Sequence, residues 1–314
     1  FHARACFVSF MLHLHFLHPL RADLESIAVR QPQRVLVARA VDEVLPTWQQ
    51  LQAWQAAGHW AAGFVAYEAA PAFASGAPVP ACAAQADLPL LWFALFRTED
   101  IVAEPMSAAG AEADIFALGA WQPAQTQGQY TQAVDQIKEA IARGETYQVN
   151  YTLPFESAFS GSSAALYAAM RSAQQAPYAA HLQLGIGEEK GEEKGAPEIL
   201  SASPELFFHW EGRAAGGGII TQPMKGTRAR GLWSAQDAAL AQELAASAKD
   251  RAENVMIVDL LRNDLGRVAQ TGSVQVHDLF AVQAYPSVWQ MTSRISARTR
   301  PEVDLLQIMQ ALFP

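Results

Sequence analysis

The pattern of apolar and polar residues predicts two α/β regions. The first covers residues 21–105 and the second residues 129–314, with a linker rich in Ala, Gly, Pro and Gln at 106–128. In the first region, strands are expected at RVLVARA (34–40), WAAGFVAYEAA (60–70) and LPLLWFALF (88–96), and a helix at WQQLQAWQAAG (48–58).

The second region contains more elements, in mixed order. A helix with one apolar face begins near Gln129 and ends at Gly144, and ETYQVNYTLPFES then alternates like a strand. Further helices are expected at 162–176, 235–247 and 250–266, and further strands at 179–185, 198–210, 272–282 and 288–298. This mixed order predicts an α+β protein rather than a doubly wound sheet. The charged repeat GEEKGEEKGAP (187–197) is interpreted as a solvated loop insertion.

The two ends of the sequence are unusual. Residues 1–20 are an apolar segment that follows the pattern of a secretory signal only in part, because histidines interrupt it and no A-x-A cleavage site follows. A core strand, or a stretch outside the natural start, is the preferred interpretation. The other end stops at Pro314 within an apolar helical pattern, so the chain is interpreted as a fragment.

Composition narrows the class of protein. The chain has 314 residues, is 51% hydrophobic and carries a net charge of −9, which is ordinary for a globular protein with a large core. An acidic balance argues against nucleic acid or an anionic membrane as the main partner. Two cysteines form neither a disulfide framework nor a zinc-ligand set, so a cytoplasmic location is predicted.

Lys225 stands in QPMKGTRARG (222–231). Pro223, two residues before it, restricts the main-chain conformation, and Gly226, directly after it, has no side chain. A ligand could approach the main chain closely there, and a lysine in such a place can serve as a nucleophile or base. The alternative is a solvated lysine on a turn.

Glu205 follows Pro204 in the apolar stretch SASPELFF (201–208). Burial would favour the protonated carboxyl that a general acid requires. The alternative is a strand residue that points outward and merely alternates with Leu206.

Asp250 and Glu253 are three residues apart and would project from neighbouring positions of a helix. Such a pair suits Mg²⁺, which usually takes one or two carboxylates together with water and substrate oxygens. The same spacing fits an N-terminal helix cap, as does Ser234 with Asp237 at the preceding helix. The charged residues of VDLLRNDLGR are interpreted as a solvated face or a buried ion pair; they are Asp259, Arg262, Asn263 and Asp264.

Taken in order, several motifs resemble the chorismate-utilising enzymes. They are GETYQVNYT (144–152), SASPELFF, QPMKGTRARG, KDRAENVMIVDLLRNDLGRV (249–268), GSVQV (272–276) and PSVWQMTS (286–293). The first region, with AAGFVAYEAAPAF (61–73), resembles the amino-terminal part of aminodeoxychorismate synthase component I. The resemblance implies two packed antiparallel β-sheets flanked by helices, with 129–314 as the chorismate-binding catalytic domain. It also implies a pattern that continues past Pro314 with G-G-S-x-T-G-A-P-K and a second carboxylate pair, so the fold is expected to be incomplete.

The resemblance also implies roles for the candidate residues. Lys225 matches a lysine proposed to attack C2 of chorismate, and Glu205 matches a glutamate proposed to protonate the leaving C4 hydroxyl. Glu253, with Asp250 beside it, matches a carboxylate pair associated with Mg²⁺. Gly226 and Thr227 would line the pocket beside the ring.

Two glutamines refine this picture. Gln148 stands where isochorismate and salicylate synthases have a lysine that activates water, and a neutral glutamine cannot act as that base. Anthranilate synthases carry alanine where Lys225 stands. Gln290 occupies a substrate-side position where much of the family has histidine.

The resemblance therefore implies an aminodeoxychorismate synthase component I, in the synthesis of 4-aminobenzoate and folate. Ammonia would come from a separate glutamine amidotransferase partner, since the sequence has no cysteine nucleophile motif of that type. One alternative is anthranilate synthase component I, because Leu24-Glu25-Ser26 faintly resembles the tryptophan-binding segment of that family. The other is a truncated remnant that binds chorismate without turnover.

Overall fold

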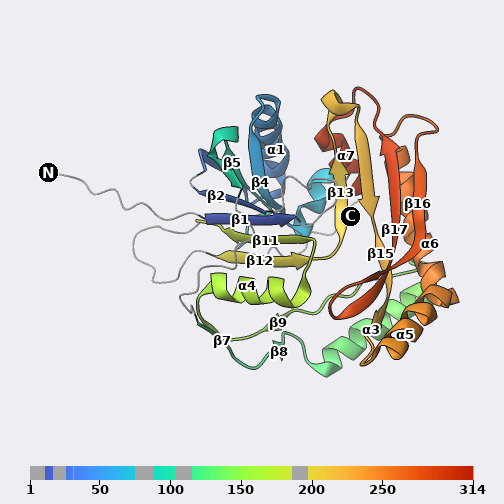
Figure 1. The fold of residues 1–314 in the computed structure, drawn as a ribbon. Helices are drawn as coiled ribbons and strands as arrows, with labels where there is room; N and C mark the ends of the chain where they lie inside the picture. The colour runs from blue at the N-terminus through green and yellow to red at the C-terminus, as the bar shows by residue number, and fades with distance from the viewer. Residues whose placement is uncertain are drawn as a thin grey trace. The chain divides into compact units, whose positions relative to one another are not determined.

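The computed structural model describes residues 11–16, 26–30, 32–74, 88–103, 115–185 and 197–313 (Figure 1). The chain forms two compact units. Unit 1 comprises Phe1–Ala108 and Tyr167–Pro314, and unit 2 comprises Ala109–Leu166. The predicted boundaries near 105 and 128 differ from this division, because strands from both predicted regions join one sheet of unit 1.

That shared sheet has the strand order β12-β11-β1-β2-β6, and all its pairings are antiparallel. Its strands are β1 (Met11–Phe16), β2 (Ser26–Arg30), β6 (Ile101–Ala103), β11 (Tyr178–Gln183) and β12 (Glu198–Ser203). Residues 11–16 of the first segment form the strand β1, which pairs with β11 on one side and with β2 on the other. Residues 1–10 and 17–20, like the predicted loop at 187–196, lie outside the described residues.

A three-stranded antiparallel sheet, ordered β3-β5-β4, is also part of unit 1. Its strands are β3 (Arg34–Ala38), β4 (Trp60–Val65) and β5 (Leu91–Phe96), and the helices that follow β3 and β4 are α1 (Val41–Ala56) and α2 (Ala70–Phe73). Leu91 and Leu95 pack with Trp48 of α1 on one side of β5. Trp92 and Phe96, on the alternate positions, pack with Leu182 of β11, so β5 is buried on both faces.

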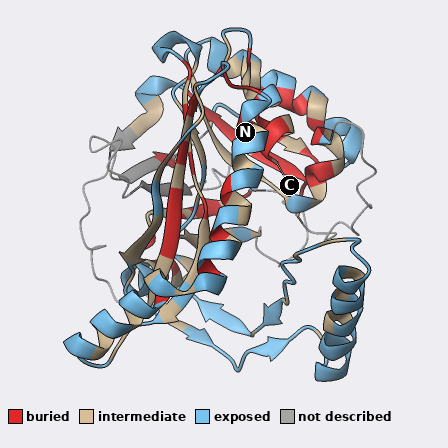
Figure 2. Cartoon of the chain, turned by 90° about the vertical axis from the view of Figure 1, so that its right-hand side faces the viewer, coloured by how far each residue is buried: buried red, intermediate tan, exposed pale blue. Residues whose placement is uncertain are grey.

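The third sheet of unit 1 carries most of the predicted site. Its order is β13-β14-β17-β15, and β16 pairs along the other edge of β17. The strands are β13 (Leu206–Trp210), β14 (Gly218–Gln222), β15 (Met224–Ala229), β16 (Gln275–Ala284) and β17 (Val288–Arg298). The associated helices are α5 (Ser234–Ala246), α6 (Ala248–Gly266) and α7 (Leu305–Leu312). Ile219 and Ile295 of this sheet pack against Val258, Leu265 and Ile308 of the helices. Figure 2 shows the buried residues concentrated on the strands and on the helix sides that face them.

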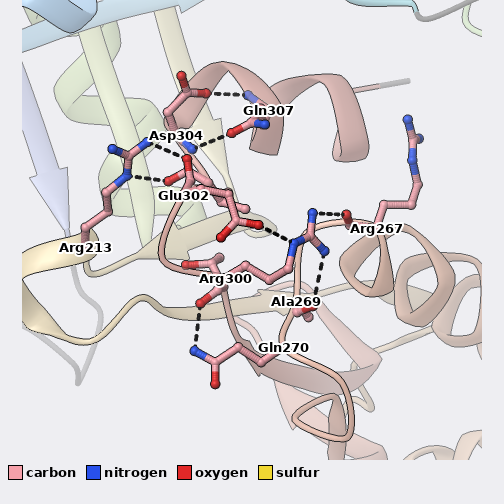
Figure 3. Close-up of polar contacts among 10 residues, drawn as sticks. Arg213, Arg267, Ala269, Gln270, Arg300, Glu302, Asp304 and Gln307 are labelled. Carbon is pink, nitrogen blue, oxygen red and sulfur yellow. Dashed lines mark hydrogen bonds and ion pairs between the residues drawn. The ribbon is translucent and has the colours of Figure 1, made fainter.

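Polar contacts fasten the turn after β17 to the helices (Figure 3). Arg300 donates to the main-chain oxygens of Arg267 (2.9 Å) and Ala269 (3.3 Å), just past the end of α6. A cation at this end also complements the helix dipole. Asp304 caps α7 by accepting a hydrogen bond from Gln307 N (2.9 Å). The turn therefore links the end of α6 to the start of α7.

Unit 2 contains β7 (Phe116–Leu118), β8 (Gln122–Pro123), α3 (Gln127–Ala142), β9 (Phe155–Glu156) and β10 (Phe159–Gly161). α4 (Ser163–Gln174) begins in unit 2 and continues into unit 1. The prediction of a strand at ETYQVNYTLPFES is wrong for most of its length, because only Phe155–Glu156 is a strand. Thr126 caps α3 by accepting from Gln129 N (3.3 Å).

Both predicted helix caps in the catalytic region are wrong. At α5, Trp233 rather than Ser234 is the N-cap residue, and its side chain makes no cap hydrogen bond. The Asp237 carboxylate accepts hydrogen bonds from Arg230 and from Gly231 N. At α6 the cap is Ser247, whose hydroxyl accepts from Asp250 N (3.2 Å). The α+β class with antiparallel sheets is confirmed.

Candidate functional site

Lys225 lies at an irregularity in the third sheet. Strands β14 and β15 run one after the other along the same edge of β17, and Pro223 separates them. Met224 pairs with Thr292 and Thr227 pairs with Gln290, so β15 holds one residue more than β17 over this interval. The extra residue is a β-bulge at Lys225–Gly226. Bulges re-aim side chains and are frequent next to active sites.

Gly226 allows the bulge to lie close to α6. Its φ is +98°, a conformation that residues with a side chain rarely adopt. A Cβ atom there would lie 3.0 Å from the Asp250 Cβ and 3.1 Å from the Leu244 Cδ1. The glycine predicted as pocket-lining therefore lies where β15 packs closely against α5 and α6.

Glu205 and Lys225 are brought together, although twenty residues separate them. Met224 N donates to the Glu205 carboxylate (3.0 Å), which places that carboxylate beside the bulge. Glu205 is exposed as a residue, yet burial of its carboxyl raises its pKa, and this rise is opposed by the Met224 hydrogen bond and by the charge of Lys225. The carboxyl is thus biased toward the protonated form that a general acid needs.

Tyr285 is a neighbour of Glu205 that the sequence did not reveal. Its hydroxyl lies 3.5 Å from the Pro204 oxygen. Burial, and then the charge of Glu205, raise the pKa of the Tyr285 phenol. The sequence offered no signal for this residue, because its proximity to Glu205 depends on the packing of the loop before β17.

Asp250 is partly buried on α6 and is held by an ion pair. Arg228 Nη2 lies 3.0 Å from the Asp250 carboxylate, and Arg228 Nε lies 2.8 Å from Glu243. The Ser247 hydroxyl and the Arg228 guanidinium lower the pKa of Asp250, while burial opposes the change. Asp250 is therefore ionised. Sequence analysis missed Arg228, although it lies in the motif that contains Lys225.

Glu253 presents a more accessible carboxylate on the same helix. Its side chain is 38% exposed, and Lys249 Nζ lies 3.8 Å away. Because Ser247 is the N-cap of α6 and bonds Asp250, capping accounts in part for Asp250 but not for Glu253. Among the described residues, no three His, Cys, Asp or Glu side chains gather as a metal site. The two carboxylates nevertheless fit Mg²⁺, which needs only one or two of them alongside water and substrate oxygens.

The other predicted substrate-side residues have different locations. Thr227 and Gln290 face each other on β15 and β17, and the Thr227 hydroxyl donates to Gln290 Oε1 (3.1 Å). Gln148 lies in unit 2, between α3 and β9, and its Oε1 is buried without a hydrogen-bond partner among the described residues. Five predicted residues and the Mg²⁺ pair are thus in the same unit, and Gln148 is in the other.

The charged residues near the end of α6 are not part of this cluster. Arg262 and Asp259 form an exposed ion pair (2.8 Å) on the surface of the helix, in line with the predicted solvated face. Burial raises the pKa of Asp264. None of the described helices is both long and apolar enough to cross a bilayer.

Comparisons with known proteins identify the family. Residues 19–314 match the chorismate binding enzyme family, and the chain belongs to it. Aminodeoxychorismate synthase component 1 of Escherichia coli (strain K12) is 40% identical over 194 residues, which are 62% of this chain and 40% of that protein. Anthranilate synthase component 1 of Streptomyces coelicolor (strain A3(2)) is 35% identical over 207 residues, or 66% of this chain and 38% of that protein.

The structural comparison supports the same fold. The crystal structure of anthranilate synthase component I from Streptococcus pneumoniae TIGR4 matches 92% of this chain and 72% of that chain, with a TM-score of 0.69 and 19% identity. The fold of chorismate-binding enzymes is confirmed. The chain spans about 40% of the length of the Escherichia coli relative that it matches.

Proposed function

We propose that the protein aminates chorismate at C4, as the component I of an aminodeoxychorismate synthase. The observation that carries the proposal is the placement of Lys225 in a β-bulge beside Glu205, whose pKa burial raises. A nucleophilic amine and a carboxyl biased toward its acid form are the two groups that this reaction requires. The chorismate binding family and the aminodeoxychorismate synthase relative support this choice.

The proposed reaction proceeds in two displacements. The Lys225 amine adds at C2 of chorismate, the ring double bonds shift, and the C4 hydroxyl leaves as water with the proton from Glu205. Ammonia then adds at C4, the double bonds shift back, and the lysine amine leaves C2. Chorismate and ammonia are thereby converted into 4-amino-4-deoxychorismate and water, and Lys225 is regenerated.

Magnesium has a supporting role in this proposal. Glu253 would hold Mg²⁺ and Asp250, paired with Arg228, would lie beside it on α6. When bound, the ion would supply positive charge to a substrate carboxylate. Thr227 and Gln290 would contact the substrate beside Gly226. Ammonia would be delivered by a glutamine amidotransferase, an inference supported by the relative being named a component 1.

Two other reactions of this family are the alternatives. Addition of water at C2, as in isochorismate synthases, needs a base where this chain has the neutral Gln148. Formation of anthranilate is the second alternative, favoured by the similarity to anthranilate synthase component 1. Lys225 argues against it, because ammonia would have to bond to C2 in that reaction, and the proposed lysine nucleophile bonds to the same carbon.

The test is a product assay on the full-length protein with chorismate, Mg²⁺ and ammonium salt. We expect 4-amino-4-deoxychorismate by chromatography and mass spectrometry, and its loss in Lys225→Ala. Lys138→Ala is the matched control, because Lys138 is an exposed lysine of α3 that pairs with Asp135 (3.6 Å), and it is in unit 2, whereas Lys225 is in unit 1. A tryptic peptide containing Lys225 should gain the mass of chorismate less one water.

Anthranilate as the product, or full activity in Lys225→Ala, would contradict the proposal. Activity that is unchanged when a chelator removes Mg²⁺ would contradict the metal assignment alone. Chorismate binding without any product would instead support a non-catalytic protein.

A further inference from the structure

Ser293 of β17 joins three segments that meet at the candidate site. Its main-chain N–H donates to the oxygen of Pro223 (3.2 Å), two residues before Lys225. Its hydroxyl donates to Asn254 Oδ1 of α6 (2.6 Å) and accepts from Phe280 N of β16 (3.1 Å). Ser293 is 0% exposed and Asn254 is 1% exposed, so water does not compete for these bonds.

The regular ladder is interrupted on both sides of this point. Thr292 pairs with Met224 on one edge of β17, immediately before the Lys225 bulge. On the other edge it pairs with Ala281, immediately after a second irregularity in β16. Within that irregularity Phe280 has a φ of +64°, a strained conformation for a residue with a side chain. Main-chain pairing is therefore interrupted on both edges of β17 beside Lys225.

Helix α6 contacts all three segments near its N-terminal end. Asp250 meets Gly226 of the bulge, the guanidinium of Arg251 lies 4.4 Å from the centre of the Phe280 ring, and Asn254 binds Ser293. Asp250 and Asn254 are four residues apart, so they lie on one face of the helix. Glu253 precedes Asn254 directly. Any shift of Asn254 along β17 would therefore move the Glu253 carboxylate relative to Lys225.

The side-chain amide of Asn254 is buried, with one of its polar atoms unsatisfied in the described part of the chain. Its Nδ2 is buried and has no hydrogen-bond partner among the described residues. Leaving a buried donor unsatisfied lowers the stability of the folded protein. An apolar residue would avoid that cost, so packing alone does not account for an asparagine here. The hydrogen bond to Ser293 does.

We propose that Ser293 and Asn254 are positioning residues that set the separation between Lys225 and Glu253. The inference rests on the proposed function, in which Lys225 attacks C2 and Glu253 holds the ion that binds a substrate carboxylate. The Ser293 hydroxyl ties α6 to β16, and the Ser293 main-chain N–H holds Pro223 beside the Lys225 bulge, so Ser293 links α6 to both edges of β17 where the two irregularities interrupt the ladder. Neither residue touches the substrate.

The experiment compares Ser293→Ala with Ser296→Ala in the full-length protein. Ser296 is a matched control, because its hydroxyl also bonds a residue of β16 across the same strand pair, here the His277 side chain at Nε2 (2.8 Å) rather than a main-chain N–H. It lies beyond both irregularities. Two quantities are measured at 25 °C: the rate at which an amine-selective acylating reagent modifies Lys225, and the steady-state kinetics with chorismate, ammonium and Mg²⁺.

We expect Ser293→Ala to lower kcat about tenfold or more and to raise the half-saturating Mg²⁺ concentration several-fold, since small displacements of catalytic groups are costly. The rate of Lys225 acylation should change by about threefold or more. Ser296→Ala should match the wild type in all three. Ser293→Thr, which keeps the hydroxyl, should recover most of kcat and shows that the effect is not one of folding.

Equal acylation rates of Lys225 in Ser293→Ala and Ser296→Ala, with a change only in melting temperature, would overturn the proposal. If the wild type forms no aminated product, the proposed function fails and the acylation rates alone decide the role of Ser293. A double-mutant cycle with Asn254→Ala adds an independent check. The double variant should lose little more activity than Ser293→Ala alone, whereas additive losses would contradict a shared role.

Discussion

Substituting Gly226 by alanine would test the geometry of the Lys225 bulge. Two costs are combined at this position. The φ of +98° is strained for alanine by about 1–3 kcal/mol. The new Cβ would also lie 3.0 Å from the Asp250 Cβ and 3.1 Å from the Leu244 Cδ1, closer than ordinary contact. Such overpacking typically costs about 1–3 kcal/mol. The free energy of unfolding should therefore fall by about 2–6 kcal/mol in total.

Gly216 separates these two costs. It has a φ of +89°, and a Cβ built on it would meet nothing within 4 Å. Gly216→Ala should therefore carry the backbone cost without the overpacking, or about 1–3 kcal/mol. Both variants are measured by urea unfolding at neutral pH, with m-values compared to confirm that the same transition is observed.

The reasoning also makes a prediction about function. Because the clash pushes the bulge away from α6, Gly226→Ala should lose amination activity while folded at 25 °C, and Gly216→Ala should keep it. Equal destabilisation of the two variants would refute the argument that Gly226 is a close approach between β15 and α6. Equal activity would show that the Lys225 bulge does not depend on that approach.

Three further predictions concern stability. Arg300→Met removes the hydrogen bonds to the main-chain oxygens past the end of α6 and should lower the free energy of unfolding in urea by about 1–2 kcal/mol. Arg262→Met, at an exposed ion pair, should lower it by less than about 0.5 kcal/mol, and equal losses would contradict the capping role of Arg300. Burial raises the pKa of Glu205 above its ordinary 4.5, so the stability of the wild type relative to Glu205→Gln should be highest below pH 4.5 and should fall as pH rises through the folded-state pKa; a difference that grows with pH would be inconsistent with this. The Arg230 guanidinium and the Gly231 N–H lower the pKa of Asp237 below its ordinary 3.8, so the advantage of the wild type over Asp237→Asn should be complete above pH 3.8 and should be lost as pH falls below it; an advantage that persists in acid would argue against this pairing.

Periodicity along the chain predicted most elements correctly. β17 was expected at 288–298 and lies at Val288–Arg298, and α4 and α5 differ from their predicted bounds by one or two residues. In each of these segments the apolar residues recur with the period of a helix or of a strand, so only that secondary structure places them on one buried face. ETYQVNYTLPFES also alternates, yet most of it is not a strand, because alternation without a neighbouring strand supplies no hydrogen-bond partners for the main chain.

The caps show the limit of local patterns more sharply. Ser234 with Asp237, and Asp250 with Glu253, have the spacing of a cap, but each aspartate binds an arginine of β15 or of the turn after it instead. An arginine from a neighbouring strand competes for the carboxylate, because its guanidinium brings a full positive charge and several N–H donors. Sequence spacing cannot reveal such a competitor, since it comes from another part of the chain.

By itself, the sequence determined the α+β class and the family, and it named the candidate site residues, because residue type and local spacing carry that information directly. Only the tertiary structure decided that β1 would pair with β11, that Lys225 would occupy a bulge, and that the Glu205 carboxylate would lie beside it. Each of these depends on which strands align and in what register. Register is set by burial and hydrogen bonding summed over whole sheets, and no single segment contains that sum.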